Sequence, residues 1–265
     1  MKNLLFVLLG LIIVTSNAFS TGLVAHYEFD NNVVDLSGTG NNGLFYNEAY
    51  GTDRFGNANS AGYFNGINAW MEVQSPKGLD LTSWTISGWI NISSITSNEN
   101  GDPLETTIIG KLNNSAGLYN YAVELRNDMR LTSQYESEFS IEPDFDHFVG
   151  YATIELNEWI FFTSIRNELD GRHALYINGN LFDEGFWFDD IPVTTPDPLY
   201  TARIASGGEN YYHGLMDDMR IYNGALSDDE IMGLYTIPEP TTFLFLASGL
   251  LGLIGIQTAR RRKNK

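Results

Sequence analysis

One predicted strand near the end of the chain places a carboxylate beside apolar side chains. By the two-residue period of a strand, Asp217 shares a face with Met219 and Ile221. Asp218 and Arg220 then point the other way and form an ordinary surface pair. An ionised carboxylate beside two apolar residues must be paired or coordinated, and calcium prefers oxygen ligands. Asp217 is therefore predicted to bind calcium. The alternative is that backbone amides or Ser and Thr hydroxyls satisfy it.

Aromatic residues in predicted loops are candidates for stacking on sugar rings. Trp187 lies between two phenylalanines and is followed by Asp189 and Asp190, and Tyr200 lies in a further loop. A flat ring stacks on the apolar face of a pyranose while carboxylates accept hydrogen bonds from its hydroxyls. These four residues are the predicted glycan site, the alternative for Trp187 being a plug over the edge of the fold. The other tryptophans lie in strand patterns and are expected in the core: Trp70, Trp84, Trp89 and Trp159.

Other chemistry has little support in the sequence. The chain has no cysteine, which excludes disulfides, thiolate metal sites and cysteine nucleophiles. Long loops then need another brace, and calcium is the expected one in an acidic chain. No two histidines have the spacing of metal ligands or of a catalytic triad: His26, His147, His173 and His213.

The elements that must position these residues are predicted to be strands almost throughout residues 22–235. The chain is 13% aromatic, only 18% charged, and contains 26 glycines. Alternating apolar runs separated by turn residues, without long helices between them, indicate an all-β antiparallel sandwich of two sheets. We expect about a dozen strands in sheets of about 5–7. One short helix is predicted after Ser227, which forms a capping box with Glu230.

The N-terminal end has the features of a secretory signal peptide. Lys2 precedes an apolar run over residues 4–14, and Ser16 and Ala18 supply the small residues of a cleavage site. Eleven apolar residues are too few to span a bilayer core of about 30 Å. Residues 1–18 are therefore predicted to be removed on export.

The C-terminal end combines three features in order. Pro238, Glu239 and Pro240 precede an uncharged stretch over residues 241–257, which as a helix of about 26 Å just spans a bilayer. A basic cluster follows, with a cytoplasmic position expected: Arg260, Arg261, Arg262, Lys263 and Lys265. Residues 238–265 resemble the PEP-CTERM sorting signal. The resemblance implies cleavage by an exosortase in a Gram-negative envelope and a membrane anchor before processing.

Charge narrows the partners of the remaining domain, residues 19–237. The net charge of the chain is −18. Six of its 15 basic residues and one of its 33 acidic residues lie in the two ends, which leaves a domain of 9 basic and 32 acidic residues, or −23. Such a domain is a poor nucleic-acid partner, because phosphate contact needs a basic patch. It suits neutral glycans, or anionic glycans through bridging calcium.

Three stretches of the domain resemble one family. They cover residues 22–43 with a Tyr-x-Phe-Asp strand, residues 157–179 ending in Leu-Tyr-Ile-Asn-Gly, and residues 214–235 with Asp-Asp-Met-Arg-Ile-Tyr. In order and spacing they resemble laminin-G-like jelly rolls of the concanavalin A-like superfamily. The resemblance implies antiparallel sheets, chain ends that pair side by side, and commonly one structural calcium. It places Asp30, at the end of the first strand, near Asp217, and Asp35 in the following loop.

Catalysis is not expected. Laminarinase-type enzymes of this superfold carry two carboxylates on one strand face, which flank the glycosidic bond. The nearest run here is Glu142-Pro143-Asp144-Phe145-Asp146, in which Asp replaces the final Glu and the proline disfavours a central strand. The sequence therefore predicts an exported cell-surface or matrix protein that binds glycan, such as exopolysaccharide, or mediates adhesion. A purely structural envelope or biofilm protein is the alternative, and a glycoside hydrolase is disfavoured.

Overall fold

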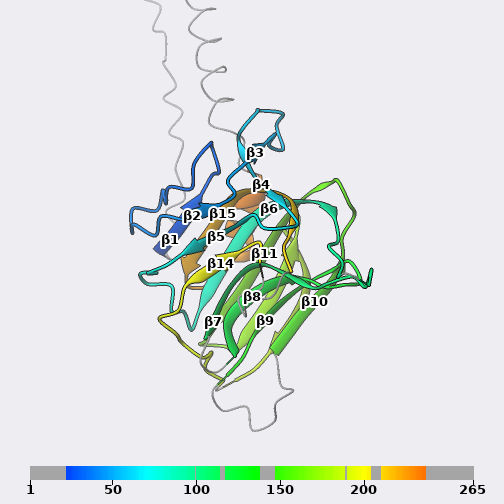
Figure 1. Ribbon diagram of the computed structural model, residues 1–265. Helices are drawn as coiled ribbons and strands as arrows, with labels where there is room; N and C mark the ends of the chain where they lie inside the picture. Colours follow the sequence, from blue (N-terminus) through cyan, green and yellow to red (C-terminus); the bar gives the residue numbers. More distant parts are fainter. Residues whose placement is uncertain are drawn as a thin grey trace, which may run out of the picture.

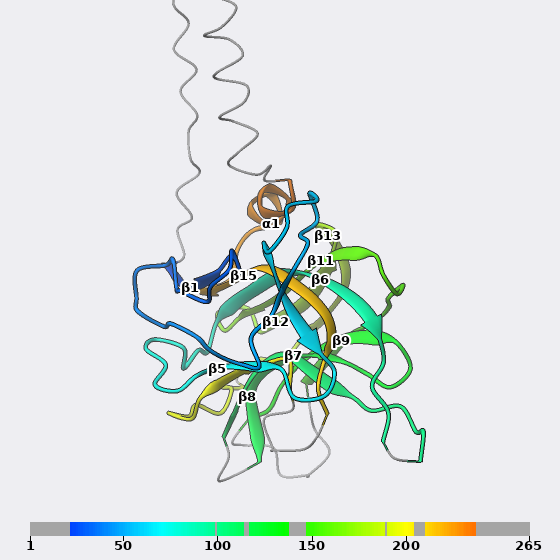
Figure 2. The same ribbon diagram turned by 45° about the horizontal axis from the view of Figure 1, so that its top comes forward.

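Alternation of apolar and polar side chains builds two antiparallel sheets that pack face to face (Figures 1 and 2). The computed structural model describes residues 22–98, 100–113, 117–137, 147–188, 190–203 and 210–236. Sheet A has the order β13-β12-β11-β6-β15-β4-β3, with β1 beside β15. Its strands are β1 (Gly22–Tyr27), β3 (Tyr50–Gly51), β4 (Ala61–Asn65), β6 (Trp84–Ser94), β11 (Trp159–Asn167), β12 (Arg172–Ile177), β13 (Asn180–Phe186) and β15 (His213–Asn223).

Sheet B has the order β10-β9-β8-β7-β14-β5-β2. Its strands are β2 (Leu44–Tyr46), β5 (Trp70–Val73), β7 (Thr106–Asn113), β8 (Leu118–Leu125), β9 (Arg130–Tyr135), β10 (His147–Thr153) and β14 (Leu199–Thr201). The predicted all-β antiparallel sandwich is confirmed. The described residues contain fifteen strands in sheets of eight and seven, more than the expected dozen. Strands of two or three residues, such as β2, β3 and β14, are too short to show a periodic pattern.

The main core lies between the two sheets. Trp84 is completely buried there, and its ring lies 5.5 Å from the Tyr121 ring of the opposite sheet. Inward residues of the longer strands other than β13 contribute, for example Ile86 on β6 and Val123 on β8. The turn between β12 and β13 is Asn178-Gly179, and both residues have positive φ, as a two-residue hairpin of the observed twist requires.

The ends of the described domain pair side by side, as predicted. β1 runs antiparallel to the second half of β15, from Gly22 opposite Asn223 to Tyr27 opposite Met219. After β15 the chain forms α1 (Asp228–Tyr235), and the predicted capping box between Ser227 and Glu230 is present. The helix packs Ile231 and Leu234 on the outer face of sheet A (Figure 2).

Both predicted targeting segments, residues 1–18 and 238–265, lie outside the described residues, including Pro238, Glu239, Pro240 and the terminal arginines. Within the part of the chain that the structure describes, no helix is long and apolar enough to cross a membrane.

Candidate functional site

A β-bulge in β15 changes which way the predicted calcium ligand points. Asp217 lies opposite Trp89 of β6 and Arg220 lies opposite Ser87, so the strand carries an extra residue between these pairs. Asp218 is in the left-handed region with φ of 54°. Met219 and Ile221 point into the core between the sheets. The prediction that Asp217 shares their face is therefore wrong, because the bulge breaks the two-residue period.

Asp217 and Asp218 belong to a buried charge network on the outer face of sheet A. Arg54 donates a hydrogen bond to the Asp217 carboxyl and forms an ion pair with the Asp218 carboxylate. Asp218 Oδ1 is also 2.7 Å from Arg220 Nη2 and 2.8 Å from His26 Nε2. Burial raises the pKa of Asp217 to about 8, with Arg54 opposing the rise. Burial acts in the same direction on Asp218, but its hydrogen bond with His26 and the Arg220 charge hold its pKa below the usual range.

The other two predicted ligands do not join Asp217 in a metal site. The Asp35 carboxylate accepts hydrogen bonds from three backbone amides and from the hydroxyls of Ser37 and Thr39, at 2.8 to 3.0 Å. These five donors use its whole acceptor capacity. Asp30 is exposed in the bend that follows β1. Among the described residues, no group of three or more His, Asp or Glu side chains has the geometry to hold a metal ion. Calcium binding stays a prediction without a ligand set.

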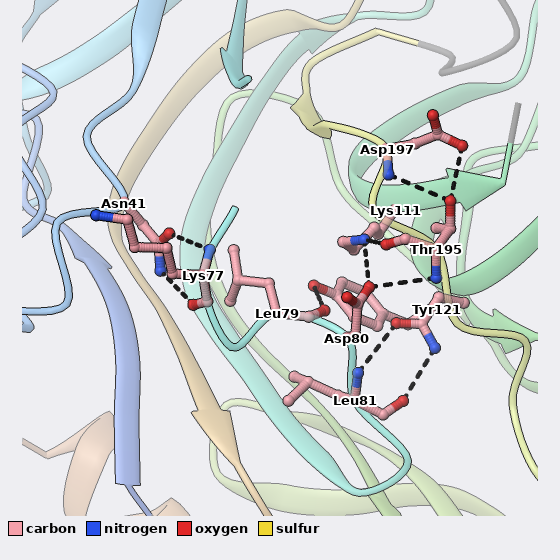
Figure 3. Close-up of polar contacts among 10 residues, drawn as sticks. Asn41, Lys77, Leu79, Asp80, Leu81, Lys111, Tyr121, Thr195 and Asp197 are labelled. Carbon is pink, nitrogen blue, oxygen red and sulfur yellow. Dashed lines mark hydrogen bonds and ion pairs between the residues drawn. The ribbon is translucent and has the colours of Figure 1, made fainter. Parts of the chain in front are cut away.

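A buried lysine, Lys111, links two long connections of the domain to a strand (Figure 3). Its side chain has no exposed area, and its ammonium donates to Asp80 Oδ1 at 2.6 Å and to the Thr195 carbonyl. The Thr195 amide also donates to Asp80 Oδ1, at 3.2 Å. Burial lowers the pKa of Lys111, while the Asp80 and Asp197 carboxylates oppose that shift. One buried ammonium thus joins β7 to the connections before β6 and before β14.

The predicted sugar-binding residue Trp187 is half-buried and packs against the core. Its ring lies 5.1 Å from the His147 ring and 6.5 Å from the Tyr135 ring. It also covers Gly185, where an added Cβ would lie 2.2 Å from the indole. This packing corresponds to the alternative of a plug over the edge of the fold.

The acidic neighbours of Trp187 do not complete an open sugar site. The Asp190 carboxylate is 2.7 Å from His147 Nε2 and accepts a hydrogen bond from Ser137. Asp189 lies outside the described residues, as does the acidic run 142–146. Tyr200 is on β14, in sheet B, away from Trp187 and its contacts.

Tyr200 belongs instead to an aromatic strip on the outer face of sheet B, formed by Tyr46, Trp70, Tyr200 and Arg203. The Tyr46 and Trp70 rings stack at 4.1 Å with 9° between their planes, and the Tyr200 ring is 5.9 Å from Trp70. The Arg203 guanidinium lies 4.2 Å from the Trp70 ring centroid and 5.6 Å from the Tyr200 ring centroid. All four side chains are partly exposed.

The expectation that Trp70 is a core residue is therefore wrong. Met71 and Val73 of β5 point into the core, so Trp70 and Glu72 lie on the opposite face. That alternation was visible in the sequence and was the one signal that could have identified Trp70. Of the four tryptophans expected in the core, Trp84 is fully buried, whereas Trp89 and Trp159 are half-buried.

A buried carboxylate lies beside the strip. Glu72 is opposite Tyr200 in the ladder between β5 and β14. It accepts hydrogen bonds from the Tyr46 hydroxyl and from Gln74 Nε2, both at 2.8 Å. The hydrogen bond to Glu72 raises the pKa of Tyr46. The strip thus combines stacked rings, a guanidinium and a held carboxylate on three adjacent strands.

The same face carries a second buried acid farther along sheet B. Glu124 on β8 accepts hydrogen bonds from Thr107 at 3.1 Å and from Gln134 at 2.9 Å. Burial raises its pKa. Three strand spacings, about 14 Å, separate β5 from β8 through β14 and β7. Glu72 and Glu124 therefore do not form the closely spaced pair that glycosidic cleavage requires.

A family model, Laminin_G_3 of the concanavalin A-like lectin/glucanases superfamily, matches residues 64–232. The chain belongs to this family. The match covers more than half of the chain and agrees with the resemblance drawn from its motifs. No curated protein matches the sequence.

Solved structures with a similar fold include a domain of an arabinanase and the binding domains of two toxins. Domain 4 of AbnA, a GH43 extracellular arabinanase from Geobacillus stearothermophilus, in complex with arabinotriose, aligns with a TM-score of 0.61 at 21% identity, over 82% of this chain and 99% of that chain. The binding domain of Paraclostridial Mosquitocidal Protein 1 aligns with a TM-score of 0.64 at 20% identity, over 81% and 52%. The botulinum neurotoxin serotype D binding domain gives 0.63 at 19%, over 83% and 52%.

The chain therefore spans about half the length of the toxin binding domains. At these identities the likeness concerns the fold alone, because function depends on the site and not on the fold.

Proposed function

We propose that this Laminin_G_3 domain binds polysaccharide at the aromatic strip on the outer face of sheet B. The observation that carries the proposal is the meeting of three partly exposed aromatic rings with Arg203 and the buried Glu72. Tyr46 and Arg203 cover the two faces of Trp70, so Tyr200 and the edges of the stacked rings provide the apolar contact area for a sugar. Guanidinium and carboxylate groups fix its orientation through hydroxyl hydrogen bonds.

Rigid positioning supports this role. Tyr46, Trp70 and Tyr200 stand on three neighbouring hydrogen-bonded strands, β2, β5 and β14. A site built on strands loses little conformational entropy on binding. The arabinanase domain of the same fold was solved with arabinotriose, which is consistent with a sugar ligand here.

We propose binding without cleavage. The two buried acids that share the outer face of sheet B, Glu72 and Glu124, are separated by three strand spacings, beyond the roughly 5–9.5 Å of glycosidase carboxylates. Each is also engaged by neutral hydrogen-bond donors. Release of reducing sugar that disappears in Glu72→Gln or Glu124→Gln would contradict this half of the proposal.

The binding test is Trp70→Ala against an immobilised glycan panel, read as dissociation constants. Loss of the central ring should weaken binding at least tenfold, about 1.4 kcal/mol. The matched control is Phe188→Ala, which removes a ring that is 68% exposed beyond sheet A and should leave affinity unchanged. Equal affinity of wild type and Trp70→Ala for every bound glycan would contradict the strip. No saturable binding at all would favour the structural alternative.

We further propose that the domain acts outside the cell, at the surface or in the extracellular matrix. The support is the signal-like residues 1–18 and the PEP-CTERM-like residues 238–265, with exosortase as the processing partner. Intact-mass analysis of the protein from a host with an exosortase should give an N-terminus at Phe19 and loss of residues 241–265. A mass that still includes residues 241–265 would contradict the sorting signal.

A further inference from the structure

Arg203 differs from most arginines of the domain in having no carboxylate partner among the residues that the structure describes. Among the described residues, five of the seven arginines have a carboxylate oxygen within 4.0 Å: Arg54, Arg126, Arg130, Arg172 and Arg220. Arg166 and Arg203 have none, and Arg166 is enclosed in the interior with 1% of its area exposed. Arg203 is therefore the one accessible guanidinium without an ion pair in the described part of the chain.

The aromatic rings hold Arg203 without using its hydrogen-bond donors. The guanidinium carbon is 4.2 Å from the Trp70 ring centroid and 5.6 Å from that of Tyr200, within the range of cation–π attraction. Its Nε is buried and has no hydrogen-bond partner. A buried donor without an acceptor is unusual in folded proteins and calls for an explanation. Because Nε is buried, a ligand on the strip would meet the other two guanidinium nitrogens, which are not among the buried unpartnered atoms of the described residues.

The chemistry of a guanidinium identifies the class of acceptor. Arginine presents its donors in a planar fork that matches the two oxygens of a carboxylate. We propose that the polysaccharide bound by the strip is acidic, and that a uronate carboxylate pairs with Arg203 while a sugar ring contacts Tyr200 or the edge of the Trp70 ring. This inference rests on the proposed function and specifies its substrate class. It replaces the expectation that anionic glycans need bridging calcium.

The net charge of the domain gives the pairing a distinctive salt dependence. The domain of −23 repels a polyanion through its many distant carboxylates. At about 0.15 M salt the screening length is about 8 Å, which suppresses this repulsion but leaves a contact pair largely intact. Binding of an acidic glycan should therefore strengthen between low and physiological salt, whereas binding through an extended basic patch weakens.

The test compares acidic and neutral forms of one backbone. The probes are oligogalacturonate, its fully methyl-esterified form and, as a second acidic backbone, alginate oligomers, measured by calorimetry on the purified protein with and without chelator. The wild type should bind an acidic oligomer at least tenfold more tightly than the ester. Arg203→Met should remove that preference and keep the ester binding, Arg203→Lys should reduce it partly, and Arg130→Met, which changes an exposed paired arginine, should not affect it. Melting temperatures confirm that each variant is folded.

The outcomes separate the two proposals. If acid and ester bind equally and Trp70→Ala weakens both, the assignment to Arg203 is wrong and the glycan site remains. An acid preference that vanishes in chelator, or survives in Arg203→Met, also overturns the assignment. If neither acidic oligomer binds better than the ester, the substrate class is wrong. If Trp70→Ala leaves all binding unchanged, the proposed function itself is wrong.

Discussion

Replacing Lys111 by methionine tests whether a buried ammonium braces the loops of this cysteine-free domain. Methionine keeps most of the volume of the lysine stem but cannot donate to Asp80 or to the Thr195 carbonyl. Removing one partner of a buried pair costs about 3–5 kcal/mol. The Asp80 side chain is 48% exposed and can be hydrated again, which reduces that cost. We expect the free energy of unfolding to fall by about 2–3 kcal/mol.

Urea unfolding at pH 7, followed by tryptophan fluorescence, measures this loss. For a domain of this size it corresponds to a melting temperature lower by about 4–12 °C. The matched control is Lys77→Met, which changes an exposed lysine in the connection that carries Asp80 and should stay within about 0.5 kcal/mol of wild type. If Lys111→Met is as stable as the wild type, the cost of burying the ammonium equals or exceeds the value of its contacts, and Lys111 is not a brace.

Three further predictions concern the charge network, the plug and calcium. Because burial raises the pKa of Asp217 from an ordinary 3.8 to about 8, its carboxyl holds a proton in the native state that the unfolded chain releases. The stability that this proton contributes is full below about pH 4 and is lost as pH rises towards 8. In urea unfolding, Asp217→Asn should therefore flatten the dependence of the unfolding free energy on pH between about 4 and 8. An unchanged dependence would contradict the raised pKa of Asp217. Trp187→Ala should lower the free energy of unfolding by about 2–4 kcal/mol, less than the loss of a fully buried tryptophan would, and should leave glycan affinity unchanged. Weaker glycan binding with unchanged stability would instead identify Trp187 as the sugar-binding residue. If calcium binds the folded domain, a hundredfold excess over its dissociation constant should raise the free energy of unfolding by about 2.7 kcal/mol. Asp217→Asn should not remove that gain, because Asp217 is hydrogen-bonded to Arg54. A verified metal-free sample whose melting temperature does not respond to calcium would contradict calcium binding.

Local patterns in the sequence were sufficient for the architecture. The strand patterns of Trp84–Ser94 and Trp159–Asn167, the Asn178-Gly179 turn and the capping box at Ser227 all predict elements that are present. These features depend on contacts between residues close in the chain, or on which side chains face a core. Both leave a period of two or a turn signature that can be recognised without knowing the partners.

Apart from the face of Trp70, which the alternation along its strand could have shown, the site depended on facts that no local pattern contains. The bulge between Asp217 and Arg220 reverses the face of one carboxylate, and its position follows from pairing with β6. Trp70 was predicted to be a core residue because its strand is apolar, but its neighbour Met71 points into the core and Trp70 points to the outer face.

Long-range contacts decided the rest. Lys111 contacts Asp80 and Thr195, which are 31 and 84 residues away in the chain. Arg203, just after β14, contacts the ring of Trp70 on β5. Burial, ion pairing and an orphaned donor arise only when distant segments are brought together. The physical reason is that strand order and register across the sheets, and not sequence spacing, set which side chains become neighbours.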